Sequence, residues 1–412
     1  MSDERKSGVT RRDFLKIGGV GVAGLAGAVG LGSLGSRNGP SHSNSTNNTE
    51  HEHLAHLEHL EQQDAQLRQS SPQQQNGEHA HGMSGTVGVV DHEANGFHPG
   101  DLLYDFDYGD VHEEDGRTVR EWRFVAVDRE IEVAPGVMFP GWVYGSATSA
   151  ASRRASELHA GQIVGQVPGP TLRCVEGELL RLHFTNAGTH EHTIHFHGIH
   201  SAFMDGAPGV GRGSIKPGET FTYEFEASPF GCHLYHCHSL PLKRHIHKGL
   251  YGAFIVDPDP EKYSGEEQAV ARTRNHTYPE NEAVNEMVMV MNAFDTNFDG
   301  ENEIYAANSI AFAYMNEPIQ IRRDQLQRVY LVNVTEFDPV NSFHLHANFF
   351  DYYDHGTTLQ PTLKTVDTIM QCQAQRGILE FSFEGFEPGL YMFHAHQTEF
   401  IELGWMSFFE VQ

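Results

Sequence analysis

The sequence has few basic residues and very little lysine. Against 55 Asp and Glu it has 28 Lys and Arg, which gives a formal net charge of -27, and only seven of these bases are Lys. This balance argues against nucleic acid or an anionic membrane surface as a partner, because both would repel the protein.

Cysteine is also scarce. The four cysteines are Cys174, Cys232, Cys237 and Cys372, too few for a disulfide-dense scaffold in a chain of 412 residues. A chain of this length is expected to form two or three domains with sizeable cores. The sequence fixes no pairing among Cys174, Cys232 and Cys372.

Residues 1–40 have the pattern of an export signal. Arg11 and Arg12 begin the run Arg-Arg-Asp-Phe-Leu-Lys, and a Gly-rich apolar stretch follows from Ile17 to about Leu34. This pattern is typical of a twin-arginine signal. We therefore predict export to the periplasm, the cell surface or the extracellular space, and an uncleaved signal would anchor the protein to a membrane.

Residues 41–97 are of low complexity. They are rich in Ser, Asn, Gln, Glu and His, and such a segment cannot bury enough apolar surface to fold alone. We interpret it as a disordered, solvated linker, and a metal-collecting tail is the alternative because His recurs at His53, His56 and His59.

From about Leu102 the pattern is that of an all-β protein. Short runs rich in Val, Ile, Phe and Tyr alternate with Gly, Pro and Asp turns, which is typical of β-sandwiches. Two units of similar size each close with a His-rich strand, which indicates an internal duplication. We predict sandwich domains at residues 98–258 and 285–412, joined by a linker at residues 259–284. The expected strands are Glu121–Val127, Leu179–Phe184, Thr220–Phe225, Gly252–Val256, Glu286–Met291, Ile319–Ile321, Val329–Val334, Gly377–Phe383 and Trp405–Val411.

Histidine is the abundant residue, and its pairing is not random. With 28 His in the chain, chance gives about two His-x-His pairs, whereas the sequence has eight. Any single pair can be an exposed or hydrogen-bonded histidine. Four pairs, however, lie in or after apolar strands, two in each unit: His195/His197, His236/His238, His344/His346 and His394/His396.

These four pairs have the spacing of metal ligands. Residues i and i+2 of a strand face the same way, so each pair projects two imidazoles from one face. Imidazole suits copper, and eight imidazoles are more than one mononuclear site can use. They suffice for a cluster of three copper ions.

Cys237 lies between His236 and His238, so it points to the opposite face of the same strand. A thiolate with two imidazoles forms a trigonal blue-copper site. His192 lies three residues before His195, on the strand face opposite to it, and His245 follows Cys237 by eight residues.

At these residues the chain resembles the multicopper oxidases, and more closely the two-domain, laccase-like kind whose blue copper lies in domain 1. The resemblance covers about residues 117–412. It includes residues 165–173 (Gly-Gln-Val-Pro-Gly-Pro-Thr-Leu-Arg), residues 236–250 and residues 394–405. It implies cupredoxin-like Greek-key domains and four copper ions per chain: one type 1, one type 2 and two type 3.

By this resemblance His192, Cys237 and His245 are the type 1 ligands, and the eight paired His hold the type 2 and type 3 ions. His247 is the rival to His245. His245 is preferred because the family's axial position, five residues after the ligand His, is then Leu250. Leu250 cannot ligate, which implies a relatively high type 1 reduction potential.

The second domain departs from a complete copper domain. Ala395 stands where the first domain has Cys237, Phe400 where a ligand His would stand, and Asn341 opposite His192. These differences remove a thiolate and two imidazoles, so we expect the second domain to contribute only cluster ligands.

The activity implied is one-electron oxidation of a reductant coupled to four-electron reduction of O2 to water. This reaction consumes protons, so an acid near the cluster is required. The family places an Asp near the position of Asp205, whose other interpretation is a turn residue before Gly206; Glu402 and Glu399 are second candidates.

Three functions compete: this oxidase, a copper nitrite reductase, and a copper-storage or electron-carrier protein. The reductant is a phenol, an aromatic amine, a metal ion or a small protein; no Met-rich insert typical of cuprous ion oxidases occurs. Each domain offers only two His pairs, so a cluster needs both kinds of domain. The two-domain relatives are trimers, and we expect a homotrimer with clusters between chains.

Overall fold

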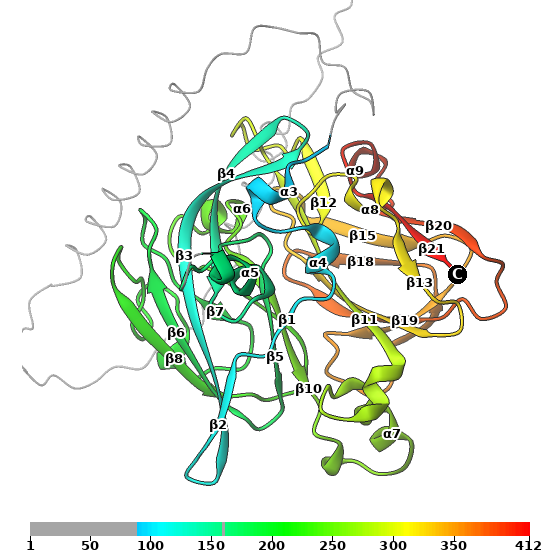
Figure 1. Ribbon diagram of the computed structural model, residues 1–412, viewed down its shortest axis with the longest axis horizontal. Helices are drawn as coiled ribbons and strands as arrows, with labels where there is room; N and C mark the ends of the chain where they lie inside the picture. The colour runs from blue at the N-terminus through cyan, green and yellow to red at the C-terminus, as the bar shows by residue number, and fades with distance from the viewer. Residues whose placement is uncertain (1–88, 159–160) are drawn as a thin grey trace, which may run out of the picture. The chain divides into compact units, whose positions relative to one another are not determined.

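The computed structural model of the protein describes residues 89–158 and 161–412, drawn in Figure 1 as strands joined by loops and short helices. The predicted export signal and most of the predicted low-complexity linker lie outside these ranges. Across the two described ranges, no helix has the length and apolar character needed to cross a membrane. The all-β prediction is confirmed, because the described strands form four sheets, two in each half of the chain.

The first domain is a sandwich of two sheets. One sheet has the order β2 (Asp110–Glu114), β3 (Arg117–Ala134), β6 (Leu179–Asn186) and β8 (Thr220–Glu226), with β4 (Val137–Ser146) also paired to β3. The other has the order β1 (Phe106–Asp107), β5 (Gly169–Val175), β10 (Tyr251–Asp257), β9 (Gly231–His236) and β7 (His195–Phe196). Side chains from both sheets, among them Leu182 and Phe254, share one core.

The strands of this domain follow from alternating sequence. In β6, Leu180, Leu182 and Phe184 are buried, whereas Arg181 and His183 between them are partly exposed. Because successive side chains of a strand point to opposite faces, this alternation presents one apolar face to the core and one polar face to solvent.

The second domain is built in the same way. One sheet has the order β12 (Ile304–Ala307), β11 (Val284–Phe294), β14 (Leu326–Asn333), β19 (Arg376–Phe381), β16 (Phe350–Asp354) and β17 (Leu363–Val366). The other has the order β13 (Ile319–Ile321), β21 (Met406–Val411), β20 (Gly389–His394), β15 (Val340–Leu345) and β18 (Thr368–Cys372). Each of the nine strands expected from the sequence overlaps one of these elements, and the largest difference is at β3, which begins four residues before Glu121 and ends seven residues after Val127.

Strand β11 is buried on both faces. Met287, Met289 and Met291 point into the core of the second domain. Val288 and Val290 pack into a second apolar cluster that also contains Val143 and Ile255 of the first domain, among others. The continuous apolar run in the sequence therefore reflects contact with both domains.

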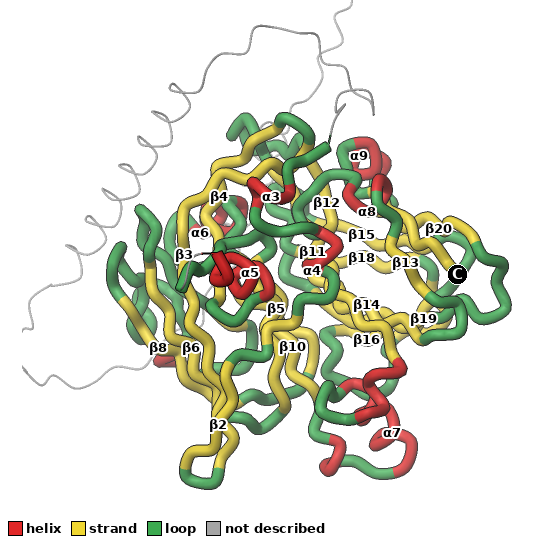
Figure 2. Tube along the Cα trace, in the orientation of Figure 1, coloured by secondary structure: helices red, strands yellow, loops and turns green. Residues whose placement is uncertain are grey.

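Helices are few and short, as the red segments of Figure 2 show. They are α3 (His92–Asn95), α4 (Pro99–Leu102), α5 (Ala150–Leu158), η1 (Ala202–Met204), α6 (Leu242–His247), η2 (Pro260–Lys262), α7 (Gly265–Arg274), η3 (Pro279–Ala283), α8 (Ala313–Asn316) and α9 (Thr398–Glu402). Helices α6 and α9 follow the last His pair of each domain.

The prediction of a disordered linker up to residue 97 is wrong at its end. Phe97 is buried, and Val90 belongs with it to the apolar cluster between the domains. Asn95 holds the segment to β3, since its Nδ2 donates to the Glu132 carbonyl and its Oδ1 accepts from the Glu132 N–H, both at 2.9 Å. Two apolar anchors and one amide side chain are enough to order this segment.

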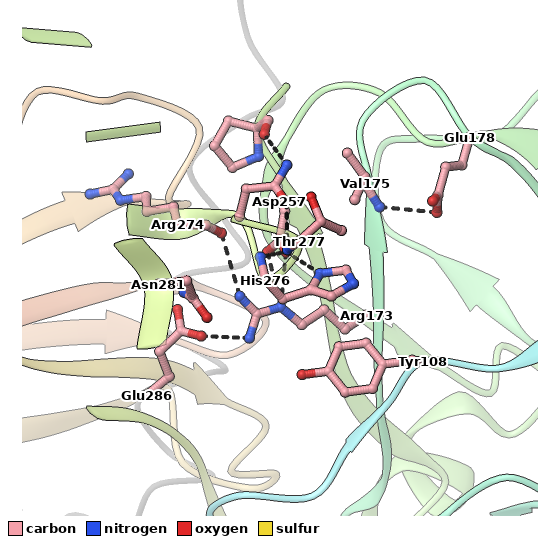
Figure 3. Close-up of polar contacts among 12 residues, drawn as sticks. Tyr108, Arg173, Val175, Glu178, Asp257, Arg274, His276, Thr277, Asn281 and Glu286 are labelled. Carbon is pink, nitrogen blue, oxygen red and sulfur yellow. Dashed lines mark hydrogen bonds and ion pairs between the residues drawn. The ribbon is translucent and has the colours of Figure 1, made fainter. Parts of the chain in front are cut away.

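Residues 259–284 are a folded connection with buried charge, not a bare linker. Arg173 of β5 donates to Asp257 at 3.0 Å and to Glu286 at 2.6 Å, and its guanidinium is 1% exposed. Glu286 also accepts from Arg328 at 2.9 Å, and His276 donates from Nδ1 to Asp257 at 2.6 Å. Figure 3 shows the side chains of Arg173, Asp257, His276 and Glu286 converging where the first domain ends and the second begins. The network therefore ties β5 and β10 to β11 and β14.

Replacing Glu286 by Ala is expected to lower the free energy of unfolding by about 3–5 kcal/mol, because it leaves Arg173 and Arg328 buried without their shared partner. Burial alone would raise the pKa of Glu286, but the two arginines lower it from 4.5 to about 2. The contribution of this carboxylate is therefore complete above pH 4.5 and is lost as the pH falls toward 2.

Urea denaturation of the Glu286→Ala protein at neutral pH measures this loss. The matched control is Asp324→Asn, which breaks an ion pair with Arg322 whose side chains are 64% and 69% exposed. That control should shift the unfolding midpoint little. Equal shifts for the two variants would show that the buried network adds no stability.

Candidate metal centres

Two imidazoles and one thiol meet inside the first domain. His192 lies in the loop before β7, Cys237 directly follows β9, and His245 lies in α6. The Nδ1 atoms of His192 and His245 are 3.2 Å apart, and Cys237 Sγ is 3.3 Å from Nδ1 of His245. We call these three residues the trigonal group. Its buried nitrogen and sulfur donors are those of a blue-copper site, so they fit a type 1 copper ion.

The surroundings of the trigonal group favour the protonation states that a metal requires. Burial by itself would raise the thiol pKa of Cys237, but hydrogen bonding to and charge interaction with His192, with help from backbone N–H groups, outweigh it and lower the pKa. The Thr193 N–H points to Sγ at 3.3 Å. Burial, and secondarily Arg244, lower the pKa of His245 to about 3, so its ring is neutral. Metal binding requires a thiolate and a neutral imidazole, and both shifts favour these forms.

Leu250 lies beside this group and offers only carbon atoms. Its N–H donates to the His245 carbonyl at 3.3 Å, and its carbonyl accepts from the Cys237 N–H at 2.9 Å. The side chain is fully buried. The position that the family resemblance gives to the axial ligand is thus occupied by a side chain that cannot coordinate.

His247 is turned away from the trigonal group. Its Nε2 accepts a hydrogen bond from the Asp295 N–H of the second domain at 2.9 Å. Its ring packs against Phe139, Phe298 and Phe337. The structure brings His245, and not His247, to Cys237.

The first half-site comprises His195, His197, His236 and His238. Strand pairing places His195 directly opposite His236, and the Nε2 atoms of His197 and His236 are 2.9 Å apart. The ring of His238 lies 5.1 Å from that of His195. His195 and His236 each donate from Nδ1 to a backbone carbonyl at 2.8 Å, that of Asp205 and that of Cys237. A carbonyl partner on Nδ1 leaves the Nε2 lone pair free for a metal ion.

The second half-site comprises His344, His346, His394 and His396, and it repeats the first. His344 pairs with His394 across β15 and β20, and the Nε2 atoms of His346 and His394 are 2.8 Å apart. The ring of His396 lies 5.2 Å from that of His344. His344 donates from Nδ1 to the Asp367 carbonyl at 3.0 Å, and His394 donates from Nδ1 to the Ala395 carbonyl.

Burial opposes protonation of five of the eight paired His. It lowers the pKa of His197 to about 2, with the neighbouring His236 as the next cause, and it lowers the pKa of His236 to about 4. Burial also lowers the pKa values of His195, His346 and His394. Imidazole nitrogens are ligands that copper prefers, so the eight paired His fit the metal.

The structure brings the paired His together within each domain but not between the domains. Among the described residues of one chain, no imidazole of the first half-site makes a ring contact or hydrogen bond with one of the second, and the two form separate candidate metal groups. The second half-site is open to solvent, because His346 and His396 are exposed.

In the second domain the place of the trigonal group is filled by other residues. The Ala395 N–H donates to the Trp405 carbonyl, and the Trp405 N–H donates to the Phe400 carbonyl, which repeats the backbone bonds of Cys237, Leu250 and His245. The ring of Phe400 stacks on Tyr305 with centroids 3.9 Å apart. Asn341 donates to the Thr335 hydroxyl at 2.9 Å. Carbon and amide groups thus replace all three donors.

Of the three predicted acids, one reaches a half-site. The carboxylate of Asp205 lies 3.2 Å from Nδ1 of His195 and is 28% exposed. Glu399 and Glu402 are exposed on α9, and within the described residues neither forms a hydrogen bond or ion pair with a paired His. Among the three predicted acids, the structure therefore places only Asp205 beside a paired His.

Three residues at these sites escaped the sequence reasoning. His200 has ligand atoms within 4.8 Å of those of His195 and Asp205. The Thr193 hydroxyl accepts from the His238 N–H at 2.8 Å, and Trp142 packs on both imidazoles of the trigonal group. Only Thr193 could have been found from the sequence, because it directly follows His192. The contacts of His200 and Trp142 depend on the tertiary fold.

The chain matches known proteins along most of its described length. Residues 147–261 match a family model described as multicopper oxidase, and residues 277–412 match a second model of the same description. A solved structure of a multicopper oxidase is 50% identical, with a TM-score of 0.67, over 79% of this chain and 100% of that chain. A copper nitrite reductase from Nitrosomonas europaea shares the fold, with 20% identity and a TM-score of 0.55 over 71% of this chain and 94% of that one.

A curated relative matches over a shorter segment. The L-ascorbate oxidase of Brassica rapa subsp. pekinensis is 42% identical over 111 residues, which are 25% of this chain and 19% of that enzyme. The chain therefore spans about a fifth of the length of this relative. Two matched domain models, a full-length structural relative at 50% identity and copper-type donor sets in both domains lead to one conclusion. The chain belongs to the multicopper oxidases, with copper as its cofactor.

Proposed function

We propose that the protein couples one-electron oxidation of a reductant to four-electron reduction of O2 to water, as a laccase-like oxidase. The observation that carries the proposal is one trigonal Cys–His group together with two matched half-sites that supply eight imidazoles. Copper in these positions supplies one-electron redox chemistry at the trigonal group and O2 reduction at a three-ion cluster. We assign His192, Cys237 and His245 to type 1 copper and the eight paired His to types 2 and 3.

The chain itself links the two chemistries. Cys237 belongs to the trigonal group, and its neighbours His236 and His238 belong to the first half-site. The Thr193 hydroxyl accepts from the His238 N–H at 2.8 Å, while the Thr193 N–H points to the thiolate at 3.3 Å. An electron accepted by copper at the trigonal group would thus have a short covalent route to the first half-site, and Thr193 hydrogen-bonds to both ends of it.

A copper nitrite reductase is the alternative, because it shares the fold. Its second site holds a single ion on three His, which would leave most of the eight paired imidazoles unused. Counting copper per chain, together with oxygen uptake under turnover, decides between the two. Four copper ions per chain and O2 consumption would support the oxidase. Two copper ions per chain and nitrite reduction would show that the protein is a nitrite reductase. Turnover with neither acceptor would indicate copper storage or electron transfer.

We propose that the active species is a homotrimer in which the first half-site of one chain faces the second half-site of the next. The separation of the half-sites within one chain and the exposure of His346 and His396 support this arrangement. Three large apolar side chains are also exposed: Phe203 at 60%, Phe349 at 54% and Met370 at 67%. An interface between chains would cover such side chains.

We also propose that the protein is exported by the twin-arginine route and acts outside the cytoplasm. Arg11, Arg12 and the apolar run after them support this proposal. Phenols, aromatic amines, a metal ion or a small protein remain the proposed classes of reductant. Oxygen uptake with one member of each class would identify the preferred donor.

Replacing Asp205 by Asn is expected to slow O2 reduction about a hundredfold or more, because a positioned general acid contributes factors of that size. The amide keeps the side-chain shape and the backbone bond to His195 but cannot deliver a proton. Reduction of the blue chromophore by the reductant should keep its wild-type rate, since that step does not involve the cluster.

Stopped-flow mixing of the fully reduced variant with O2 measures this effect. Reoxidation at the wild-type rate would remove Asp205 from the mechanism. A slow Glu399→Gln or Glu402→Gln protein beside a normal Asp205→Asn protein would place the proton donor in the second domain.

A further inference from the structure

The two imidazoles of the trigonal group are closed off from solvent. His192 is 0% exposed and His245 is 3% exposed. A reductant outside the protein therefore cannot touch either ring in this chain. Electrons must reach the group through the residues that cover it.

Trp142 is the aromatic residue that covers both rings. Its ring centroid lies 5.4 Å from that of His192 and 4.9 Å from that of His245. The backbone fixes its place, because the Trp142 N–H donates to the Lys248 carbonyl at 2.8 Å, just beyond α6. Trp142 is itself 6% exposed. It therefore contacts the trigonal group while a small part of it reaches the surface.

Two partly exposed side chains lie against the same indole. The ring of His190 is centred 4.4 Å from that of Trp142, and the Arg244 guanidinium lies 4.9 Å from the ring centroid. His190 is held by a contact of 2.9 Å between its Nδ1 and the Thr189 hydroxyl. These two residues form the rim that a reductant in solution can reach.

We infer that Trp142 is the residue through which electrons pass from the reductant to the trigonal group, with His190 and Arg244 as the surface that the reductant contacts. This inference rests on the proposed oxidase function. In each event the reductant loses one electron, the type 1 Cu(II) gains it and becomes Cu(I), and no bond of the protein forms or breaks. A phenolic reductant releases its proton to water.

The indole suits this role for a physical reason. Its delocalised ring is the largest π-system that the chain can place between the surface and the ligand imidazoles, and it spans from His190 to both of them. A side chain without a π-system would leave either saturated carbon or water in the same space. The other two tryptophans, Trp122 and Trp405, are buried in the cores of the two domains.

The test compares Trp142→Phe and Trp142→Leu with a matched control, Trp122→Phe. Trp122 lies in the same domain, and its Nε1 donates to the Asp107 carbonyl at 3.2 Å, away from the trigonal group. The copper-loaded proteins are mixed anaerobically with hydroquinone, and the decay of the blue band is followed together with the midpoint potential of that band.

We expect Trp142→Leu to slow reduction of the blue band about tenfold or more, equivalent to about 1.4 kcal/mol of barrier, at an unchanged midpoint potential. Trp142→Phe should fall between this variant and wild type, and Trp122→Phe should match wild type. A Trp142→Leu protein that is reduced as fast as wild type, or whose slower rate is explained by a shifted potential, would overturn the inference.

A second readout needs no turnover. Binding of Cu(II) to copper-free protein should quench the fluorescence of Trp142, and this part of the quenching should be absent from Trp142→Phe and present in Trp122→Phe. Undiminished quenching in Trp142→Phe would contradict the placement of the indole. A wild-type protein without any blue band would overturn the proposed function as well, whereas a normal blue band with reduction independent of Trp142 would overturn this inference alone.

Discussion

Replacing Cys237 by Ser is expected to abolish the intense blue absorption of the copper-loaded protein and its oxidase activity, while the two half-sites stay loaded. The blue colour of such centres depends on a thiolate bound to copper, and a serine hydroxyl is a far weaker and harder donor. Cys237 is the thiol whose pKa is lowered by His192 and by backbone N–H groups, despite its burial. Visible absorption, copper content and oxygen uptake together measure the effect.

Cys232→Ser is the matched control. Cys232 lies on β9, the strand that Cys237 directly follows, and is equally buried, and its replacement by Ser makes the same change of sulfur to oxygen. Burial raises the pKa of its thiol to about 12, and among the described residues it joins no candidate metal group. The control should remain blue and active. If Cys232→Ser bleaches the protein and Cys237→Ser does not, the assignment of the thiolate is wrong.

The strands were predictable because their signal is local. The alternation of apolar and polar residues in Leu179–Asn186 indicates a strand with one buried face. The spacing of His195 and His197 indicates two side chains on the same face of a strand. The pairing of His195 with His236 is a consequence of strand register, which the sequence indicated only through the repetition of the pattern in both domains.

Features that depend on tertiary packing were not predictable. Residues 259–284 are polar, and nothing local shows that Arg274 is buried against Glu380 and Tyr353. The placement of Trp142 against the two imidazoles of the trigonal group arises from the register of β4 with β3 and from a backbone bond to Lys248. Likewise, the direction in which the short helix α6 turns each side chain places His245, and not His247, near Cys237.

The two domains preserve one hydrogen-bonding scheme around different chemistry. The His238 N–H donates to the Thr193 hydroxyl, and the His396 N–H donates to the Ser342 hydroxyl, both at 2.8 Å. The scheme positions the paired His in each domain whether or not a thiolate lies between them. A domain can thus lose its trigonal group and keep its half-site, which explains how the second domain retains four imidazoles around Ala395.

Mixing two inactive variants is expected to restore activity if the clusters lie between chains. One variant carries His197→Ala and His236→Ala and lacks a working first half-site; the other carries His346→Ala and His394→Ala and lacks a working second half-site. Each should be inactive alone, because the Nε2 pairs at 2.9 Å and 2.8 Å are removed. The second variant keeps its trigonal group, so its first half-site can still receive electrons.

In a closed ring, each first half-site meets the second half-site of the next chain. The variant with His346→Ala and His394→Ala supplies the only intact first half-sites, and the variant with His197→Ala and His236→Ala supplies the only intact second half-sites. When equal amounts assemble at random, about a quarter of the junctions join two intact half-sites, so about a quarter of the wild-type activity should return. Two different variants that both lack the first half-site should give none when mixed, which controls for subunit exchange alone. Mixed trimers verified by mass that stay inactive, or a fully active monomer in sedimentation, would contradict shared clusters. A recovery that follows the composition of the mixture would instead establish that O2 is reduced between chains, because no single chain in the mixture then holds both halves of a cluster.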